Sequence, residues 1–157
     1  MIRIDVLGTP APKGSDRIAL RGGKPRFVPG SSKTNAEKQR SFAAAIRDQM
    51  ALVLGDAPGP CFVGKPLAVA IVFRLKRPAA HWSKKGGLLP SAPSAPSVKP
   101  DVDKLARQAV DVLTGAVFDD DARIVELLVR KEYAAPGREG ASIVVDMFAD
   151  TVRGEQE

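Results

Sequence analysis

Two groups of aspartates near the middle of the chain carry the side chains best suited to chemistry. Asp101 and Asp103 stand two apart where a proline-bounded segment leads into a predicted helix, and Asp119, Asp120 and Asp121 follow that helix. In an extended or first-turn geometry the first pair can face one cation, and a return of the chain can bring the second group beside it. Mg²⁺ prefers such oxygen ligands, and water and substrate phosphate often complete its shell. Clustered carboxylates without a cation repel one another, so the pattern indicates a divalent-metal site.

Each aspartate also has a purely structural interpretation. Asp101 can cap the helix that follows it, and Asp103 can pair with Arg107 at the i,i+4 spacing. The run of three aspartates can be an exposed turn. Taken singly, the residues favour these interpretations, and only their combination favours a metal site.

The charge of the chain points to a polyanionic partner. The net charge is +6, and residues 1–100 contain 17 of the 24 Lys and Arg residues but only 5 of the 18 Asp and Glu residues. A nuclease needs a basic surface to attract phosphates and a compact acidic site to hold metal. A basic solvated surface without function is the other interpretation. With one cysteine and one histidine, Cys61 and His81, a zinc site is excluded, so oxygen must hold any metal.

The elements that would position these aspartates follow from hydrophobic periodicity. We expect one α+β domain over residues 1–157, with a small mixed sheet, two main helices and a tail at 150–157, in the order ββαβαββ if an early hairpin is counted. The expected strands are 2–6, 66–75, 123–133 and 141–148, with a hairpin of 18–20 and 26–28 around Gly22 and Gly23. The expected helices run from Thr34 or Asn35 to Leu54 and from Asp101 to Leu113.

Between strand 66–75 and the second helix, residues 76–100 form a proline-rich segment with basic residues and no acid. We expect a mobile loop that contacts nucleic acid, or else a solvated linker. Trp82 could stack on an unpaired base. No apolar run is long enough to span a bilayer, and the N-terminus lacks the apolar stretch of a signal peptide. We therefore expect a cytoplasmic protein without a membrane partner.

The segment KPDVDKLARQAVDVLTG, followed by FDDDARIV, resembles the signature of the RusA family of Holliday junction resolvases. In that signature a D-x-D-N-L-x-K-x-x-x-D-x-L helix precedes a D-D-x-x-[IV] strand. The N-terminal TPAPKGS is similar to the P-x-P-K-G-R segment common in phage-type members. The resemblance is strong over residues 99–127 and looser elsewhere.

The resemblance implies that Asp101, Asp103 and Asp121 bind Mg²⁺, for which Mn²⁺ is a possible substitute, with Asp120 as the register alternative to Asp121. The catalytic lysine of the signature falls on Arg107, and its asparagine falls on Lys104. Arg107 retains the positive charge but is a poor proton donor, so we expect it to stabilise charge.

The resemblance also implies a homodimer that binds a four-way DNA junction and nicks two strands symmetrically, leaving 5′ phosphates and 3′ hydroxyls. Two other functions remain open: a noncatalytic basic DNA-binding protein, suggested by Arg107 and Lys104, and a Mg²⁺ phosphohydrolase of small phosphates, against which the basic excess argues. The residues expected to contact DNA are Lys13, Arg17, Lys76, Arg77, Lys84, Lys85, Lys99 and Lys104.

Overall fold

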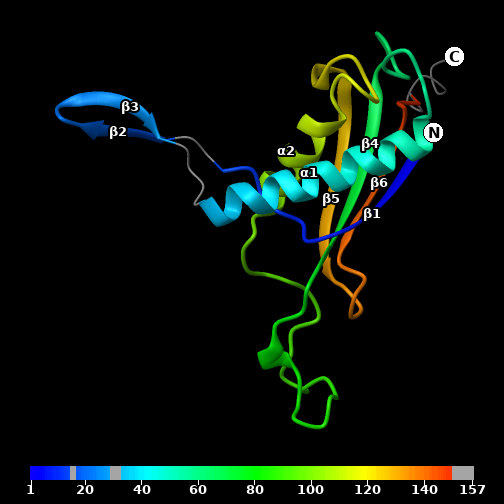
Figure 1. Cartoon of the computed structure of the whole chain (residues 1–157). Helices are drawn as coiled ribbons and strands as arrows, with labels where there is room; N and C mark the ends of the chain where they lie inside the picture. Colours follow the sequence, from blue (N-terminus) through cyan, green and yellow to red (C-terminus); the bar gives the residue numbers. More distant parts are fainter. Residues whose placement is uncertain (15–16, 29–32, 150–157) are drawn as a thin grey trace, which may run out of the picture.

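A computed structural model describes residues 1–14, 17–28 and 33–149 (Figure 1). Two helices, two short 3-10 turns and six strands follow one another along these residues. Their order and bounds are β1 Ile2–Leu7, β2 Arg17–Arg21, β3 Lys24–Val28, α1 Lys33–Leu54, β4 Leu67–Leu75, η1 Ala79–His81, α2 Val102–Leu113, η2 Asp121–Arg123, β5 Ile124–Tyr133 and β6 Gly140–Met147.

The main sheet has four strands in the order β1-β6-β4-β5. β4 pairs with β5 in parallel and with β6 antiparallel, and β1 pairs antiparallel with β6. A parallel neighbour requires a crossover, and the chain from β4 to β5 supplies one that contains α2. The sheet is therefore mixed, and the predicted α+β class is confirmed.

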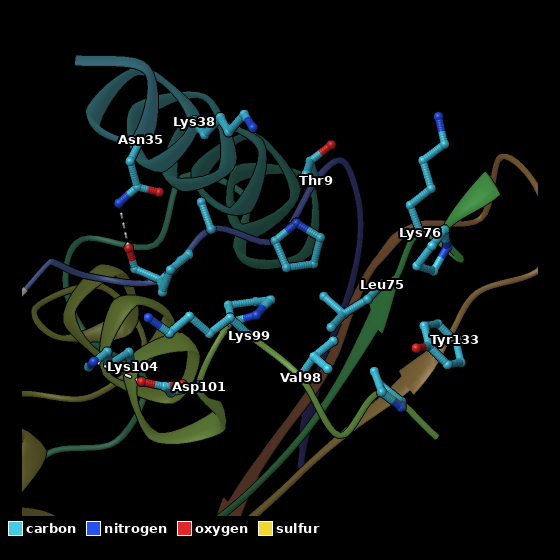
Figure 2. A pocket seen from close by; sticks show the side chains of 16 residues that line it. Thr9, Asn35, Lys38, Leu75, Lys76, Val98, Lys99, Asp101, Lys104 and Tyr133 are labelled. Atoms are coloured by element: carbon cyan, nitrogen blue, oxygen red, sulfur yellow. Dashed lines mark hydrogen bonds and ion pairs between the residues drawn. The ribbon is translucent and has the colours of Figure 1, made fainter. Parts of the chain in front are cut away.

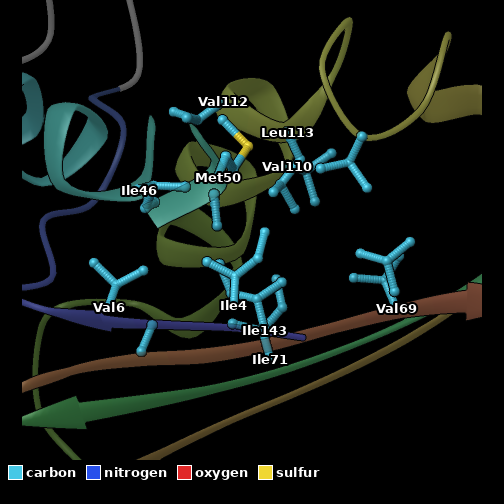
Figure 3. Packing of buried hydrophobic residues seen from close by; sticks show 14 of the residues in the cluster. Ile4, Val6, Ile46, Met50, Val69, Ile71, Val110, Val112, Leu113 and Ile143 are labelled. Atoms are coloured by element: carbon cyan, nitrogen blue, oxygen red, sulfur yellow. The ribbon is translucent and has the colours of Figure 1, made fainter. Parts of the chain in front are cut away.

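Both helices lie on the same face of this sheet, and the hydrophobic core fills the space between them (Figure 3). α1 buries Phe42, Ile46 and Met50, whose spacing of four places them on one side of the helix. Alternate residues of β4 are buried against them, as the two-residue period of a strand requires. One cluster of buried side chains therefore joins α1, α2 and the strands β1, β4 and β6, and the partly buried Ile124 and Val129 of β5 pack against it.

The early hairpin is present as a separate two-stranded sheet of β2 and β3. Gly22 and Gly23 both have positive φ, 61° and 74°, as a two-residue hairpin turn that suits the strand twist requires. Since the hairpin contributes two strands, the observed order is βββαβαββ rather than ββαβαββ. The other predicted elements are present, with ends that shift by one or two residues.

Residues 76–100 do not form one structureless loop. They contain the 3-10 turn η1, an isolated bridge between Trp82 and Leu88, and a backbone hydrogen bond from Leu89 N–H to the His81 carbonyl. The predicted mobility of this segment stays a prediction. Among the described residues, no helix is long and apolar enough to cross a membrane. The predicted tail, 150–157, lies outside the described residues.

Candidate active site at the start of α2

α2 places charged residues of the signature on the side of the helix that faces β5. Its apolar residues, such as Leu105, Ala109 and Leu113, are buried in the core. Asp103, Arg107 and Asp111 are four residues apart, so they form one stripe along the helix. All three line a cavity of about 320 Å³ whose opposite wall includes Leu127 and Val129 of β5. We call this space the α2–β5 cavity.

Asp121 reaches the same cavity from η2, the 3-10 turn that leads into β5. The structure thus places three of the four predicted catalytic side chains, Asp103, Arg107 and Asp121, around one space. Asp103 does not form the ion pair with Arg107 that their spacing allows. The side chains of Asp103 and Asp121 have no hydrogen bond or ion pair with another described residue, so both carboxylates are available to a ligand.

The two neighbours of Asp121 have structural tasks. Asp120 is the N-cap of η2, and its Oδ1 accepts a hydrogen bond from Ala122 N–H at 2.9 Å. Asp119 Oδ2 accepts from Gly64 N–H at 3.2 Å and lies 3.6 Å from the Arg123 guanidinium. These contacts favour Asp121 over Asp120 as the residue that faces α2.

Asp101 lies on the other side of the α2 N-terminus. It has the N-cap position, but its side chain makes no capping hydrogen bond. Lys104 Nζ instead donates to Asp101 Oδ2 at 2.7 Å. This hydrogen bond and the Lys104 charge hold the pKa of the Asp101 carboxyl below its ordinary value of 3.8, and the pKa of Lys104 is raised in turn. The predicted cap is therefore an ion pair inside the first turn.

A lysine of β5 holds the segment before Asp101 in place. Lys131 Nζ donates to the Val98 carbonyl at 2.6 Å and to the Pro100 carbonyl at 2.9 Å. Asp101 and Lys104 both line a second cavity, of about 480 Å³, shown in Figure 2. The three predicted metal ligands are thus divided between two cavities.

Within the described parts of the chain, no three His, Cys, Asp or Glu side chains are placed so that they could hold a metal ion together. Mg²⁺ needs fewer protein ligands when DNA takes part, because one or two carboxylates often suffice with water and phosphate. Asp103 and Asp121 provide two such carboxylates in the α2–β5 cavity. Their carboxylate oxygens therefore fit a divalent cation whose coordination shell is completed by water and substrate phosphate.

Asp111 is the residue of this cavity that our sequence analysis did not select. Its carboxylate forms an ion pair with Lys13 from the N-terminal segment, and the Lys13 backbone N–H donates to the Lys104 carbonyl at 3.1 Å. Two features of the sequence could have identified Asp111: it matches the last aspartate of the signature helix, and it lies four residues after Arg107. The contact with Lys13 joins residues 98 positions apart and has no sequence signal.

The basic residues expected to contact DNA are divided among several places. Lys76, Lys99 and Lys104 line the 480 Å³ cavity. Arg77 lies over the Tyr133 ring, 4.1 Å from its centroid, and donates to the Pro93 carbonyl at 2.8 Å. Lys84 and Lys85 are exposed in the segment 76–100. The side chain of Arg17 lies outside the described side chains, and Trp82 lines a different hollow with Lys76 and Arg77.

Comparison with known protein families gives one match. A family model described as "Endodeoxyribonuclease RusA" covers residues 8–144, which begin directly after β1 and include β2 to β5, both helices and the first part of β6. Among curated proteins, no relative matches the sequence. The matched range contains both cavities and all of the aspartates discussed above.

Proposed function

Because the chain belongs to the RusA family of endodeoxyribonucleases, we propose that it resolves four-way DNA junctions by metal-dependent strand cleavage. The observation that carries this proposal is the α2–β5 cavity, where the carboxylates of Asp103 and Asp121, which have no partner among the described residues, line the same space as Arg107. An acidic pair with an adjacent cation suits a phosphodiester, since the acids hold metal and the cation neutralises phosphate charge.

We propose Asp103 and Asp121 as ligands of Mg²⁺, with Mn²⁺ as a substitute. Asp101 is the third proposed ligand, and it must leave Lys104 to act as one. When bound, the cation would activate water for attack and reduce the charge on the phosphate. The division of the three acids between two cavities supports a site that is completed when DNA binds.

Arg107 lies one helical turn after Asp103 on the same side of α2. An arginine side chain carries a positive charge, so its proposed role is to stabilise the negative charge that develops on the phosphate. The proposed products are a 5′ phosphate and a 3′ hydroxyl. Lys76, Lys99 and Lys104, with Lys84 and Lys85 in the segment 76–100, are proposed to bind neighbouring phosphates.

A homodimer is part of the proposal, because a twofold enzyme presents two identical sites to a pseudo-twofold junction. β5 is an edge strand of the sheet, and Val125, Leu127 and Leu128 on it are 57%, 47% and 67% exposed. A long apolar edge with unpaired backbone groups invites another strand. We propose that the second copy pairs its own β5 antiparallel with this edge.

The charges of β5 support one register for this pairing. If Leu128 meets its twofold mate, residues whose numbers sum to 256 lie opposite each other. Glu126 then faces the Arg130 of the second copy, and this happens twice. Leu127 faces Val129, and both residues line the α2–β5 cavity. The two proposed active sites would therefore flank the dimer seam.

The test uses a synthetic four-way junction and a matched duplex, with and without Mg²⁺. Asp103→Asn and Asp121→Asn are expected to abolish nicking without weakening junction binding, because removal of negative charge does not repel phosphate. Asp120→Asn is the matched control, since asparagine also serves as an N-cap, and it should cleave as wild type. Wild-type cleavage by Asp103→Asn and Asp121→Asn would contradict the proposed site.

A second candidate is a noncatalytic DNA-binding protein of the same fold. The ion pair between Asp101 and Lys104 favours it, because Lys104 neutralises a carboxylate that the metal would need. Junction binding without cleavage under any divalent cation would establish this alternative. We further propose that residues 1–157 act as one domain, and a cytoplasmic location stays a prediction.

A further inference from the structure

A second cavity lies on the opposite side of the α2 N-terminus from the α2–β5 cavity. It has a volume of about 480 Å³ and is enclosed by segment 9–12, the N-terminal part of α1, the end of β4, segment 96–101 and Tyr133. We call it the proline–lysine cavity. Its volume lies in the range of about 300–1,000 Å³ that is usual for small-molecule sites. The proposed cleavage uses Asp101 and three lysines of this cavity, but it gives no role to the apolar part of the lining.

The cavity has a cationic end and an apolar end (Figure 2). Lys99, Lys104 and Asp101 lie toward one end, whereas Leu75, Val98 and Tyr133 lie toward the other. With Lys38, and with Lys76, which Figure 2 shows beside Leu75 near the apolar end, the lining has four lysines against one carboxylate. The structure gives Lys38, Lys76 and Lys99 no ion pair with another described residue. The lining therefore has an excess of positive charge that a phosphate could neutralise.

The apolar end is built to be rigid. Leu75 is 8% exposed, and the neighbouring lining includes several prolines, which have little conformational freedom to lose on binding. Arg77 covers one face of the Tyr133 ring at 4.1 Å, and His81 meets the ring edge-on with centroids 5.5 Å apart. A flat aromatic ligand can therefore lie against a preformed surface. A phosphate joined to a flat aromatic group is a nucleotide.

From this geometry we propose that the proline–lysine cavity binds one unstacked nucleotide of the cleaved strand, next to the scissile phosphate. Asp101 lines this cavity, and Asp103, two residues later, lines the α2–β5 cavity. A strand that places a phosphate near Asp103 therefore passes the start of α2 and reaches the cavity with an adjacent nucleotide. Taking a base out of the stack costs least where it is already unpaired. This gives a physical reason for preferring a branch point, and the inference rests on the proposed function.

The test measures base unstacking without cleavage. Four-way junctions carry 2-aminopurine at single positions around the cleavage site, and the full-length protein is added in EDTA so that no strand is cut. Fluorescence should rise at one position only, because that base leaves its neighbours. Val98 is 62% exposed, so Val98→Trp should fill the apolar end with little effect on folding. It should remove the rise and weaken junction binding roughly 5- to 150-fold, which corresponds to the ~1–3 kcal/mol of one stacked base.

Lys99→Ala tests the cationic end. It should reduce the fluorescence rise and lower the salt slope of junction binding by about 1, as expected for one lost phosphate contact. Lys65→Ala is the matched control, because Lys65 is exposed and lines neither cavity. No rise at any position, or the same behaviour in Val98→Trp, Lys99→Ala and Lys65→Ala, would overturn the nucleotide site. If the wild type shows the rise but never cleaves with Mg²⁺ or Mn²⁺, the proposed catalysis fails and the nucleotide site stands.

Discussion

Charge reversal on β5 tests the proposed dimer most directly. In the register centred on Leu128, Glu126 of each copy lies opposite Arg130 of the other. A directly opposed pair contributes about 0.2–1 kcal/mol, and like charges in the same place are destabilising. Glu126→Arg therefore exchanges two attractive pairs for two repulsive ones, a change of about 0.8–4 kcal/mol per dimer. At 1.4 kcal/mol per factor of ten, the dissociation constant should rise between roughly fourfold and several-hundred-fold.

The assay is sedimentation over a range of protein concentrations, with the double variant Glu126→Arg plus Arg130→Glu as the rescue. The double variant restores opposite charges across the seam and should restore the dimer. Glu132→Arg is the matched control: it makes the same charge change on the same strand, but within the described parts of the chain Glu132 forms its ion pair with Arg130 of its own chain, at 3.5 Å. If Glu126→Arg dimerises as wild type, or if the double variant does not recover, the pairing of β5 with its own copy is wrong.

Three further predictions concern single residues. Arg107→Ala should slow single-turnover cleavage by ~10² or more, as loss of one electrostatic contact in the transition state does, whereas Arg107→Lys should keep most activity; normal cleavage by Arg107→Ala would make it a structural cation. Lys104→Gln should raise the pKa of Asp101 toward 3.8 in an NMR titration, and an unchanged Asp101 pKa would contradict the ion pair. Because the pKa of Asp101 is lower in the folded protein than in the unfolded chain, the pair stabilises the fold above pH 3.8. This stabilisation is lost as the pH falls through the folded pKa. Gly140→Ala should lower the melting temperature, since its Cβ would lie 1.8 Å from the Val6 carbonyl oxygen, and an unchanged melting temperature would show that β1 can move away.

The order and type of the main elements were predictable because each one has a local signal. Alternating buried residues along β4 and the stripe of Phe42, Ile46 and Met50 on α1 reflect periods of two and of about four residues in the sequence. The sheet order was not predictable in the same way. β5 pairs in parallel with β4 although β6 lies closer to it in the chain, and this follows from the crossover through α2 and from packing, not from any local pattern.

The candidate site was only partly predictable for the same reason. Asp103 and Arg107 share a face of α2 by helical geometry alone, so their spacing was sufficient to place them together. Asp121 could be distinguished from Asp120 only in three dimensions, where Asp120 caps η2 and Asp121 faces α2. The family signature selects Asp121 through its offset from Ile124. In the structure this offset places Asp121 at the start of η2, the turn that leads into β5 at Ile124.

Asp101 shows where sequence reasoning lacks the necessary information. A residue at a helix N-cap can turn its side chain toward the backbone of the first turn or toward a neighbouring side chain, and the two choices differ by only about 1 kcal/mol. In this chain Lys104, three residues after Asp101, supplies a charged partner at 2.7 Å. The RusA signature has asparagine at the position of Lys104. The Asp101 carboxylate, paired with Lys104, lines the proline–lysine cavity. A phosphate that binds Lys104 competes with Asp101 for the same ammonium group, so DNA binding itself would release the carboxylate toward the α2–β5 cavity. The departure from the signature at Lys104 is then compatible with the proposed catalysis, and it would make the binding of metal by Asp101, the proposed third ligand, depend on the presence of substrate.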